Sequence, residues 1–266
     1  MRKACILSLV ALCLLLCGTA MSRESGVVGA FYGGWGTNKG NYIWLEGHGS
    51  RGAIPLLADV NGDGRADAVT VKDGTWSVAP AGPGQTFGAP MTWRRSFGGD
   101  AAAVLAGDVN GDGRADAVVV ELSGSGRYRW RIAPVADGSF ARPRALVSDF
   151  GRQGDIALLG DVTGDGRADA VAVDRERGVW RVAPSSRKPG DAAGIWIRDM
   201  SPGCTVCFVA DVTGDGAADA VAYDERGKRW TVAPSDGENG FRAQSAWREG
   251  FGGDEVLVGD ATGDGR

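Results

Sequence analysis

The sequence predicts an all-β protein, a β-propeller of four-stranded antiparallel blades, and three observations support this prediction. First, one nine-residue phrase rich in Asp and Gly returns at intervals of 49, 53, 50 and 49 residues. Second, each interval holds four short runs of β-branched and aromatic residues bounded by Gly, Asp and Pro. Third, helix caps and sustained helical periodicity are missing along the sequence. A period of about fifty residues maps onto one small sheet, which favours a blade over a sandwich, and a solenoid would need shorter coils.

Residues 1–20 have the composition of a secretory signal peptide. Arg2 and Lys3 precede the apolar run ACILSLVALCLLLCG, and small residues up to Ala20 form a cleavage pattern. The run is shorter than the ~20 residues that cross a bilayer, so we expect a secreted protein with no membrane span in the mature chain. An uncleaved anchor is the alternative. A lipid anchor at Cys17 is disfavoured because a bulky leucine precedes that cysteine.

The remainder is predicted to contain an N-terminal segment, residues 21–49, able to supply a ring-closing strand, and propeller repeats over 50–266. In the second repeat the four strand-like pieces are AAAVLAGD, ADAVVVEL, YRWRIAP and FARPRALV. In the third piece Trp130 and Ile132 alternate with arginines, so one face should be buried. Four repeats are nearly complete and a fifth has only begun. We expect a longer parent protein, because a blade cut inside a loop leaves its strands unpaired.

Composition and charge restrict the partners. Gly accounts for 44 of 266 residues, yet 43% of residues are hydrophobic, which indicates a packed structure with many turns. The net charge of −4 becomes −6 when the signal, with its two basic residues, is removed. No basic patch is present, so nucleic acid is not an expected partner. An extracellular glycan or protein is the expected one.

Each nine-residue phrase has the pattern D-x-[NT]-x-D-G-x-x-D and predicts a Ca²⁺-binding loop. Side-chain oxygens stand at positions 1, 3, 5 and 9, a backbone carbonyl at position 7 can also point inward, and such oxygen ligands suit calcium. The loops are 59–67, 108–116, 161–169 and 211–219, with a partial fifth at 260–266. The candidate ligands, with position 7 acting through its carbonyl, are Asp59, Asn61, Asp63, Arg65 and Asp67; Asp108, Asn110, Asp112, Arg114 and Asp116; Asp161, Thr163, Asp165, Arg167 and Asp169; Asp211, Thr213, Asp215, Ala217 and Asp219; and Asp260, Thr262 and Asp264.

Two other structures also use loops rich in Asp and Gly, the EF-hand and the metal-free turn. An EF-hand needs a bidentate Glu at position 12 and a following helix, whereas Thr70, Val119, Ala172 and Ala222 stand there and strands follow. A metal-free turn also favours Asp and Gly. It would, however, leave three carboxylates in each loop without a compensating charge, so calcium is favoured. Threonine at position 3 of the third and fourth loops is the weaker ligand.

These loops resemble the FG-GAP or VCBS repeat family, which forms the blades of the integrin α head and of many secreted bacterial proteins. The resemblance covers residues ~50–266 and includes Phe97-Gly98, Phe150-Gly151 and Phe251-Gly252 ahead of the first strand. It implies a seven-bladed propeller whose calcium loop joins the first two strands of each blade. The chain departs from the family in its threonines at position 3 and in carrying fewer than seven blades.

Two series of tryptophans repeat with the blades. Trp76, Trp130, Trp180 and Trp230 each stand four residues before a proline, and Trp44, Trp93, Trp196 and Trp247 fall in the fourth strand-like run. A large aromatic at one strand position of every blade is typical of packing between blades, so both series are predicted to be core. Exposed tryptophans could instead stack on sugar rings, as similar propeller lectins imply.

The mature chain keeps two cysteines, Cys204 and Cys207, in a C-x-x-C spacing. In an exported protein this spacing predicts a local disulfide. A redox or metal role is disfavoured because Pro202-Gly203 before the motif and an apolar run after it predict no helix. Free thiols are the other alternative.

No catalytic residue is predicted. His48 is the only histidine, and we expect it to be a turn residue at the entrance to the first blade. Residues 26–40, GVVGAFYGGWGTNKG, faintly resemble the first barrel strand of certain glycoside-hydrolase-like proteins. The sequence therefore predicts a calcium-binding adhesion or binding module that is not an enzyme. The alternative is an accessory propeller of a larger carbohydrate-active enzyme.

Overall fold

The computed structural model describes residues 30–31, 42–43, 48–83, 86–185 and 192–251. Every regular element in these ranges is a β-strand, and the strands form four antiparallel four-stranded sheets and three two-stranded ones. The predicted signal peptide and the fifth metal loop lie outside the described residues. No helix among the described residues has the length and apolar character needed to cross a bilayer.

Each four-stranded sheet is one blade, with its strands hydrogen-bonded in chain order. The first blade contains β3 (Ile54–Ala58), β4 (Asp67–Lys72), β5 (Thr75–Ala79) and β8 (Met91–Arg94); the second β9 (Ala103–Gly107), β10 (Asp116–Leu122), β11 (Tyr128–Ala133) and β14 (Arg144–Val147); the third β15 (Ile156–Gly160), β16 (Asp169–Asp174), β17 (Val179–Ala183) and β18 (Gly194–Ile197); and the fourth β19 (Val206–Ala210), β20 (Asp219–Asp224), β21 (Arg229–Ala233) and β22 (Ser245–Glu249). The two-stranded sheets pair β1 (Ala30–Phe31) with β2 (Tyr42–Ile43), β6 (Ala81–Gly82) with β7 (Thr86–Phe87), and β12 (Val135–Ala136) with β13 (Ser139–Phe140).

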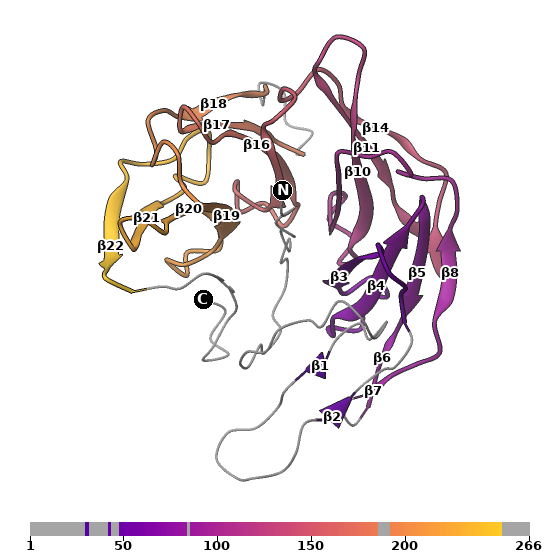
Figure 1. Cartoon of the computed structure of the whole chain (residues 1–266). Helices are drawn as coiled ribbons and strands as arrows, with labels where there is room; N and C mark the ends of the chain where they lie inside the picture. Colours follow the sequence, from indigo (N-terminus) through magenta and orange to yellow (C-terminus); the bar gives the residue numbers. More distant parts are fainter. Residues whose placement is uncertain (1–29, 32–41, 44–47, 84–85, 186–191, 252–266) are drawn as a thin grey trace.

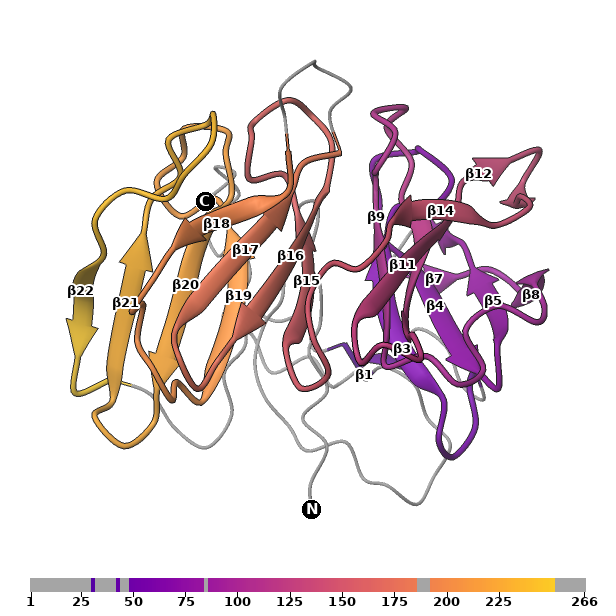
Figure 2. The same cartoon turned by 90° about the horizontal axis from the view of Figure 1, so that it is seen from above.

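The blades follow one another around an arc, as Figure 1 shows. Their first strands are neighbours, since β3 contacts β9, β9 contacts β15 and β15 contacts β19. Seen from above, the third and fourth blades stand on one side and the first and second on the other (Figure 2). The all-β fold built from successive four-stranded blades confirms the sequence-based prediction.

The third strand of each blade carries the tryptophan of the first series into the core. Trp76, Trp130 and Trp180 are fully buried, whereas Trp230 in the fourth blade is only partly buried. In every blade the pairing of the third and fourth strands shifts register at this residue, which marks a bulge. The predicted burial is therefore confirmed for three blades and incomplete for the fourth.

The phenylalanine of the Phe-Gly motif accepts a hydrogen bond from the same tryptophan. The indole N–H donates to the carbonyl oxygen of Phe97, Phe150 and Phe251 in the first, second and fourth blades, at 2.9 Å in each case. In the third blade Met200 takes the place of the phenylalanine, and the Trp180 indole N–H has no hydrogen-bond partner among the described residues. The Phe-Gly motif ahead of one blade is thus hydrogen-bonded to the third strand of the preceding blade.

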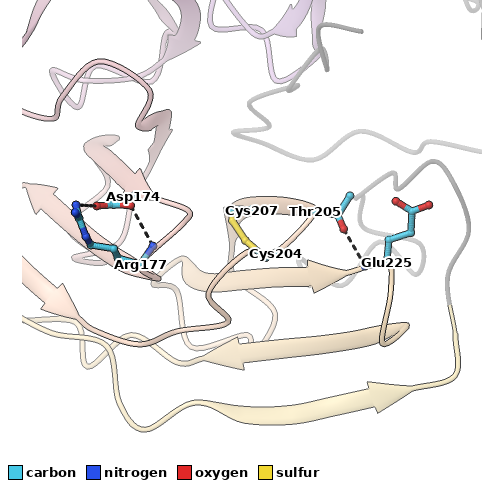
Figure 3. Close-up of a disulfide and its surroundings, with 6 residues drawn as sticks. All are labelled: Asp174, Arg177, Cys204, Thr205, Cys207 and Glu225. Atoms are coloured by element: carbon cyan, nitrogen blue, oxygen red, sulfur yellow. Dashed lines mark hydrogen bonds and ion pairs between the residues drawn. A yellow bond between two sulfur atoms is a disulfide. The ribbon is translucent and has the colours of Figure 1, made fainter. Parts of the chain in front are cut away.

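A disulfide lies close to this departure, at the start of the fourth blade. Cys204 lies just before β19 and Cys207 within it, and both are buried in the disulfide that joins them (Figure 3). Beside it, the N–H of Glu225 donates to the hydroxyl oxygen of Thr205 at 2.9 Å. The predicted local disulfide is confirmed, and the chain around it forms no helix.

Adjacent blades approach closely at the ends of their first strands. A Cβ added at Gly107 would lie 2.7 Å from Leu159 Cδ2, and one added at Gly160 would lie 2.6 Å from Val209 Cγ2. Both distances are shorter than any ordinary carbon–carbon contact. Glycine therefore allows the second blade to pack on the third, and the third on the fourth.

Gly160→Ala should consequently destabilise the protein by about 1–3 kcal/mol, because the new methyl group overpacks the contact with Val209. Chemical denaturation monitored by tryptophan fluorescence measures the change. Gly194→Ala is the matched control, since an added Cβ in that strand has only one neighbour, 3.8 Å away. Equal unfolding midpoints for the two variants would contradict this account of the blade contact.

Candidate metal-binding loops

The four complete Asp-rich loops join the first and second strands of their blades. The first begins directly after β3 and ends where β4 begins, at Asp67, and the other three repeat this placement. Gly62 and Gly64 at positions 4 and 6 have φ values of 79° and 80°, which glycine adopts readily and other residues do not. The loop position that the family resemblance implied is therefore the observed one.

The aspartate at position 1 organises its own loop. Asp59 accepts hydrogen bonds from the backbone N–H groups of Gly62 (2.7 Å) and Asp63 (3.2 Å) through Oδ1, and from Gly64 (2.7 Å) through Oδ2. Asp108 and Asp211 accept the same three bonds in their loops. This carboxylate therefore fixes the turn that follows it.

The aspartate at position 9 is fully buried in all four loops. In the first loop Asp67 accepts the N–H of Val60 (3.0 Å) at one oxygen and that of Ala81 (2.7 Å) at the other. Ala81 directly follows the proline that ends the third strand. The other three blades make the same two bonds, which join Asp116 to Val109 and Val135, Asp169 to Val162 and Ser185, and Asp219 to Val212 and Ser235.

This role predicts that position 9 stabilises a blade even without metal. Asp116→Ala leaves the N–H groups of Val109 and Val135 without their acceptor, which should cost about 1–3 kcal/mol in the presence of chelator. Asp112→Asn in the same loop is the control, because it removes only a surface ion pair with Arg114 and should change little. Denaturation in excess chelator measures both. If the two variants unfolded alike, position 9 would have no structural role of its own.

Burial also disfavours negative charge at position 9. Loss of solvent raises the pKa of Asp67 and of Asp116 to about 6, and that of Asp169 to about 7, and it also raises the pKa of Asp219. The nearby carboxylates at positions 1 and 5 raise the pKa of Asp67 further. A bound cation would relieve this unfavourable charge, so the electrostatics of each loop favour a positive ion.

Positions 3, 5 and 7 differ between the loops. The Asn61 amide donates to Asp67 Oδ1 at 3.2 Å, and Arg65 pairs with Asp63 at 2.7 Å. Thr163 donates its hydroxyl to Asp169 Oδ2 at 3.1 Å. In the fourth loop the Thr213 hydroxyl oxygen is buried and has no hydrogen-bond partner among the described residues. This orphaned oxygen occupies a predicted ligand position.

The donor set fits calcium, although the side chains do not yet converge. Within the described residues no three His, Cys, Asp or Glu side chains are grouped to hold a metal ion. The position-1 carboxylates face backbone amides, and Asp63 and Asp112 face arginines. The loops nevertheless offer the oxygen ligands that Ca²⁺ prefers. These include buried carboxylates whose pKa is raised and the Thr213 hydroxyl, which has no hydrogen-bond partner among the described residues. Ion binding would require Asp63 and Asp112 to leave their arginine partners.

The other residues that the sequence singled out, His48 and the second tryptophan series, lie outside the Asp-rich loops. His48 is buried, with Nε2 3.1 Å from the carbonyl oxygen of Ala68, and burial lowers its pKa. It thus links the segment ahead of β3, at the entrance to the first blade, to β4. In the second tryptophan series Trp93 and Trp196 are buried, Trp247 is 49% exposed, and Trp44 lies outside the described residues. Most of residues 26–40 also lie outside them.

Sequence reasoning missed the bond from position 9 to the residue after the third-strand proline. Packing of the tryptophans between blades was predicted, but their phenylalanine partners were not identified from the sequence. Phe140 packs on Trp93 of the preceding blade with ring centroids 5.2 Å apart, and Phe241 packs on Trp196 at the same distance. For the bond from position 9, the recurrent Trp-x-x-x-Pro spacing was an available signal, since the bonded residue always follows that proline.

The fold and the loops together define a β-propeller repeat protein. A family model described as an FG-GAP-like repeat matches residues 59–119 and again residues 108–172. Residues 59–172 thus belong to the FG-GAP-like repeat family, as the resemblance of the loops predicted. A search of curated proteins returned no match.

Solved structures provide a further comparison. A structure from Agrocybe aegerita, described as a lectin that specifically recognises non-reducing terminal N-acetylglucosamine, has a TM-score of 0.61 at 23% identity. The match covers 85% of this chain, which spans 63% of the lectin's length. A Photorhabdus luminescens Tc holotoxin pore matches 74% of this chain and 12% of its own, at 17% identity and a TM-score of 0.34. The lectin comparison supports the fold.

Proposed function

We propose that this chain is a secreted, calcium-binding propeller module that binds an extracellular glycan or protein and catalyses no reaction. The observation that carries the calcium assignment is the repeated burial of the position-9 carboxylate beside two further carboxylates, with no basic side chain paired to it in the part of the chain that the structure describes. Positions 1, 3, 5 and 9 and the position-7 carbonyl would hold the ion. Calcium would supply positive charge that offsets the carboxylates and orders the loop.

The glycan part of the proposal rests on the lectin similarity. That lectin is described as recognising non-reducing terminal N-acetylglucosamine, and its fold extends over most of this chain. The first ligand class to examine is therefore a glycan that ends in N-acetylglucosamine.

A glycan microarray probed with the fluorescently labelled chain tests this part. We expect binding to glycans ending in N-acetylglucosamine and reduced binding when the same glycans are capped with galactose. Excess chelator should reduce binding, because loosened loops loosen the blades. A chain that binds calcium but none of the arrayed glycans would exclude the glycan assignment and leave a protein ligand.

A further inference from the structure

The four described loops are hydrogen-bonded to one another in chain order. The backbone N–H at position 8 donates to the carbonyl oxygen of the position-1 aspartate in the preceding loop. The three bonds join Ala115 to Asp59 at 2.7 Å, Ala168 to Asp108 at 2.6 Å, and Ala218 to Asp161 at 2.6 Å. The backbone that carries the first ligand of one loop is therefore fixed by the loop that follows.

A side-chain contact accompanies each bond. The glycine at position 4 of one loop faces the position-7 side chain of the next. A Cβ added at Gly62 would lie 2.9 Å from Arg114 Cγ, and one added at Gly111 would lie 3.2 Å from Arg167 Cγ. At the last pair the residue is smaller, and a Cβ at Gly164 would lie 3.4 Å from Ala217 Cβ. The position-7 side chain thus covers the turn between ligand positions 3 and 5.

We propose that the residue at position 7 of each loop positions the calcium ligands of the preceding loop and thereby couples neighbouring sites. This inference rests on the proposed calcium binding. The aliphatic stem of Arg114 restricts the turn at Gly62, which lies between Asn61 and Asp63. Without that stem the turn gains freedom that ion binding must remove, so the first site binds calcium more weakly.

The test first removes calcium binding by the second loop, which contains Arg114, and then replaces Arg114. In the Asp108→Ala chain the second loop has lost its first ligand, so a further Arg114→Ala change acts on calcium affinity through the first loop. Isothermal titration with calcium chloride should show one remaining site weakened at least about fivefold, the lower end of usual coupling between sites. An unchanged affinity would overturn the coupling while leaving calcium binding intact.

Arg65 provides the matched control. It pairs with its position-5 aspartate at 2.7 Å, as Arg114 does at 2.8 Å, but the residues that the structure describes include no Asp-rich loop ahead of it. Adding Arg65→Ala to the Asp59→Ala chain should leave the remaining affinities unchanged. A loss equal to that caused by Arg114→Ala would show a general effect of removing arginine and would overturn the assignment.

A conservative variant separates the stem from the charge. Arg114→Met keeps an unbranched side chain over Gly62 and removes the guanidinium, so in the Asp108→Ala chain it should restore the affinity that Arg114→Ala loses. A loss that methionine does not restore would overturn the role of the stem.

Far-ultraviolet circular dichroism checks that each variant is folded. If a variant is unfolded, the same comparison is made with Asp161→Ala and Arg167→Ala, and the calcium affinity of the second loop is measured instead. An unaltered chain that gives no heat signal of either sign with calcium and whose melting temperature calcium does not change would refute the proposed function itself.

Discussion

Removal of calcium should lower the melting temperature of this protein by more than any single substitution does. Each complete loop holds three aspartates, and the one at position 9 is fully buried. Two carboxylates about 4 Å apart repel by on the order of 4 kcal/mol at an effective dielectric constant of ~20, before the loop relaxes. An ion at ~100 times its dissociation constant stabilises the folded state by about 2.7 kcal/mol per independent site. Differential scanning calorimetry in calcium and in excess chelator measures the sum over the loops.

A pair of variants checks that the effect comes from the loops. Asp108→Asn removes one ligand charge and should reduce the calcium-dependent shift by at least one site's share. Asp137→Asn changes an aspartate in the turn between β12 and β13, at a φ of 50° that asparagine also accepts, and should leave the shift unaltered. A melting temperature indifferent to chelator would mean that these loops are ordinary Asp and Gly turns.

Trp130→Ala should be the most destabilising single core substitution, at about 3–5 kcal/mol. The side chain is fully buried, its indole N–H donates to Phe150 O at 2.9 Å, and the two rings lie 6.0 Å apart. Truncation leaves a cavity in the second blade and an unpaired carbonyl oxygen at its edge. Urea denaturation monitored by circular dichroism measures the loss.

The outer tryptophan of the fourth blade is the control for this substitution. Trp247 is 49% exposed, so Trp247→Ala should cost far less than Trp130→Ala. Trp130→Phe keeps most of the ring volume but loses the indole hydrogen bond, and its cost should fall between the two. Similar losses for Trp130→Ala and Trp247→Ala would contradict the assignment of the third-strand series to the core.

The strands could be predicted because their signals are local. In Tyr128–Ile132 the period-two alternation placed Trp130 and Ile132 on one face, and both are fully buried while Arg129 is exposed. Partial burial of Trp230 could not be predicted in this way. Burial on the outer face of a blade depends on the neighbouring blade, and that information lies outside the blade's own sequence.

The candidate site was predictable in its ligand types but not in its contacts. The spacing of Asp, Asn and Gly identified the loops, and their position between first and second strands is as the resemblance implied. The bond from the N–H of Val135 to Asp116 was not predicted, because the two residues stand 19 apart and meet through the pairing of β10 with β11, and the recurrent proline before Val135 does not by itself name the acceptor. The arginine contacts of Asp63 and Asp112 likewise depend on the folded loop.

The hydrogen bonds of the position-9 aspartate affect how ions are counted from sequences of this kind. The residue has a structural role in every blade, because its two hydrogen bonds join the start of the loop to the residue that follows the third-strand proline. A repeat could therefore lose its metal and still retain this aspartate. The position-9 aspartate alone therefore indicates a properly closed blade. The residues at positions 3 and 5 indicate whether the loop can bind an ion. A count of bound ions that is based on the number of aspartates in such repeats would therefore be too high.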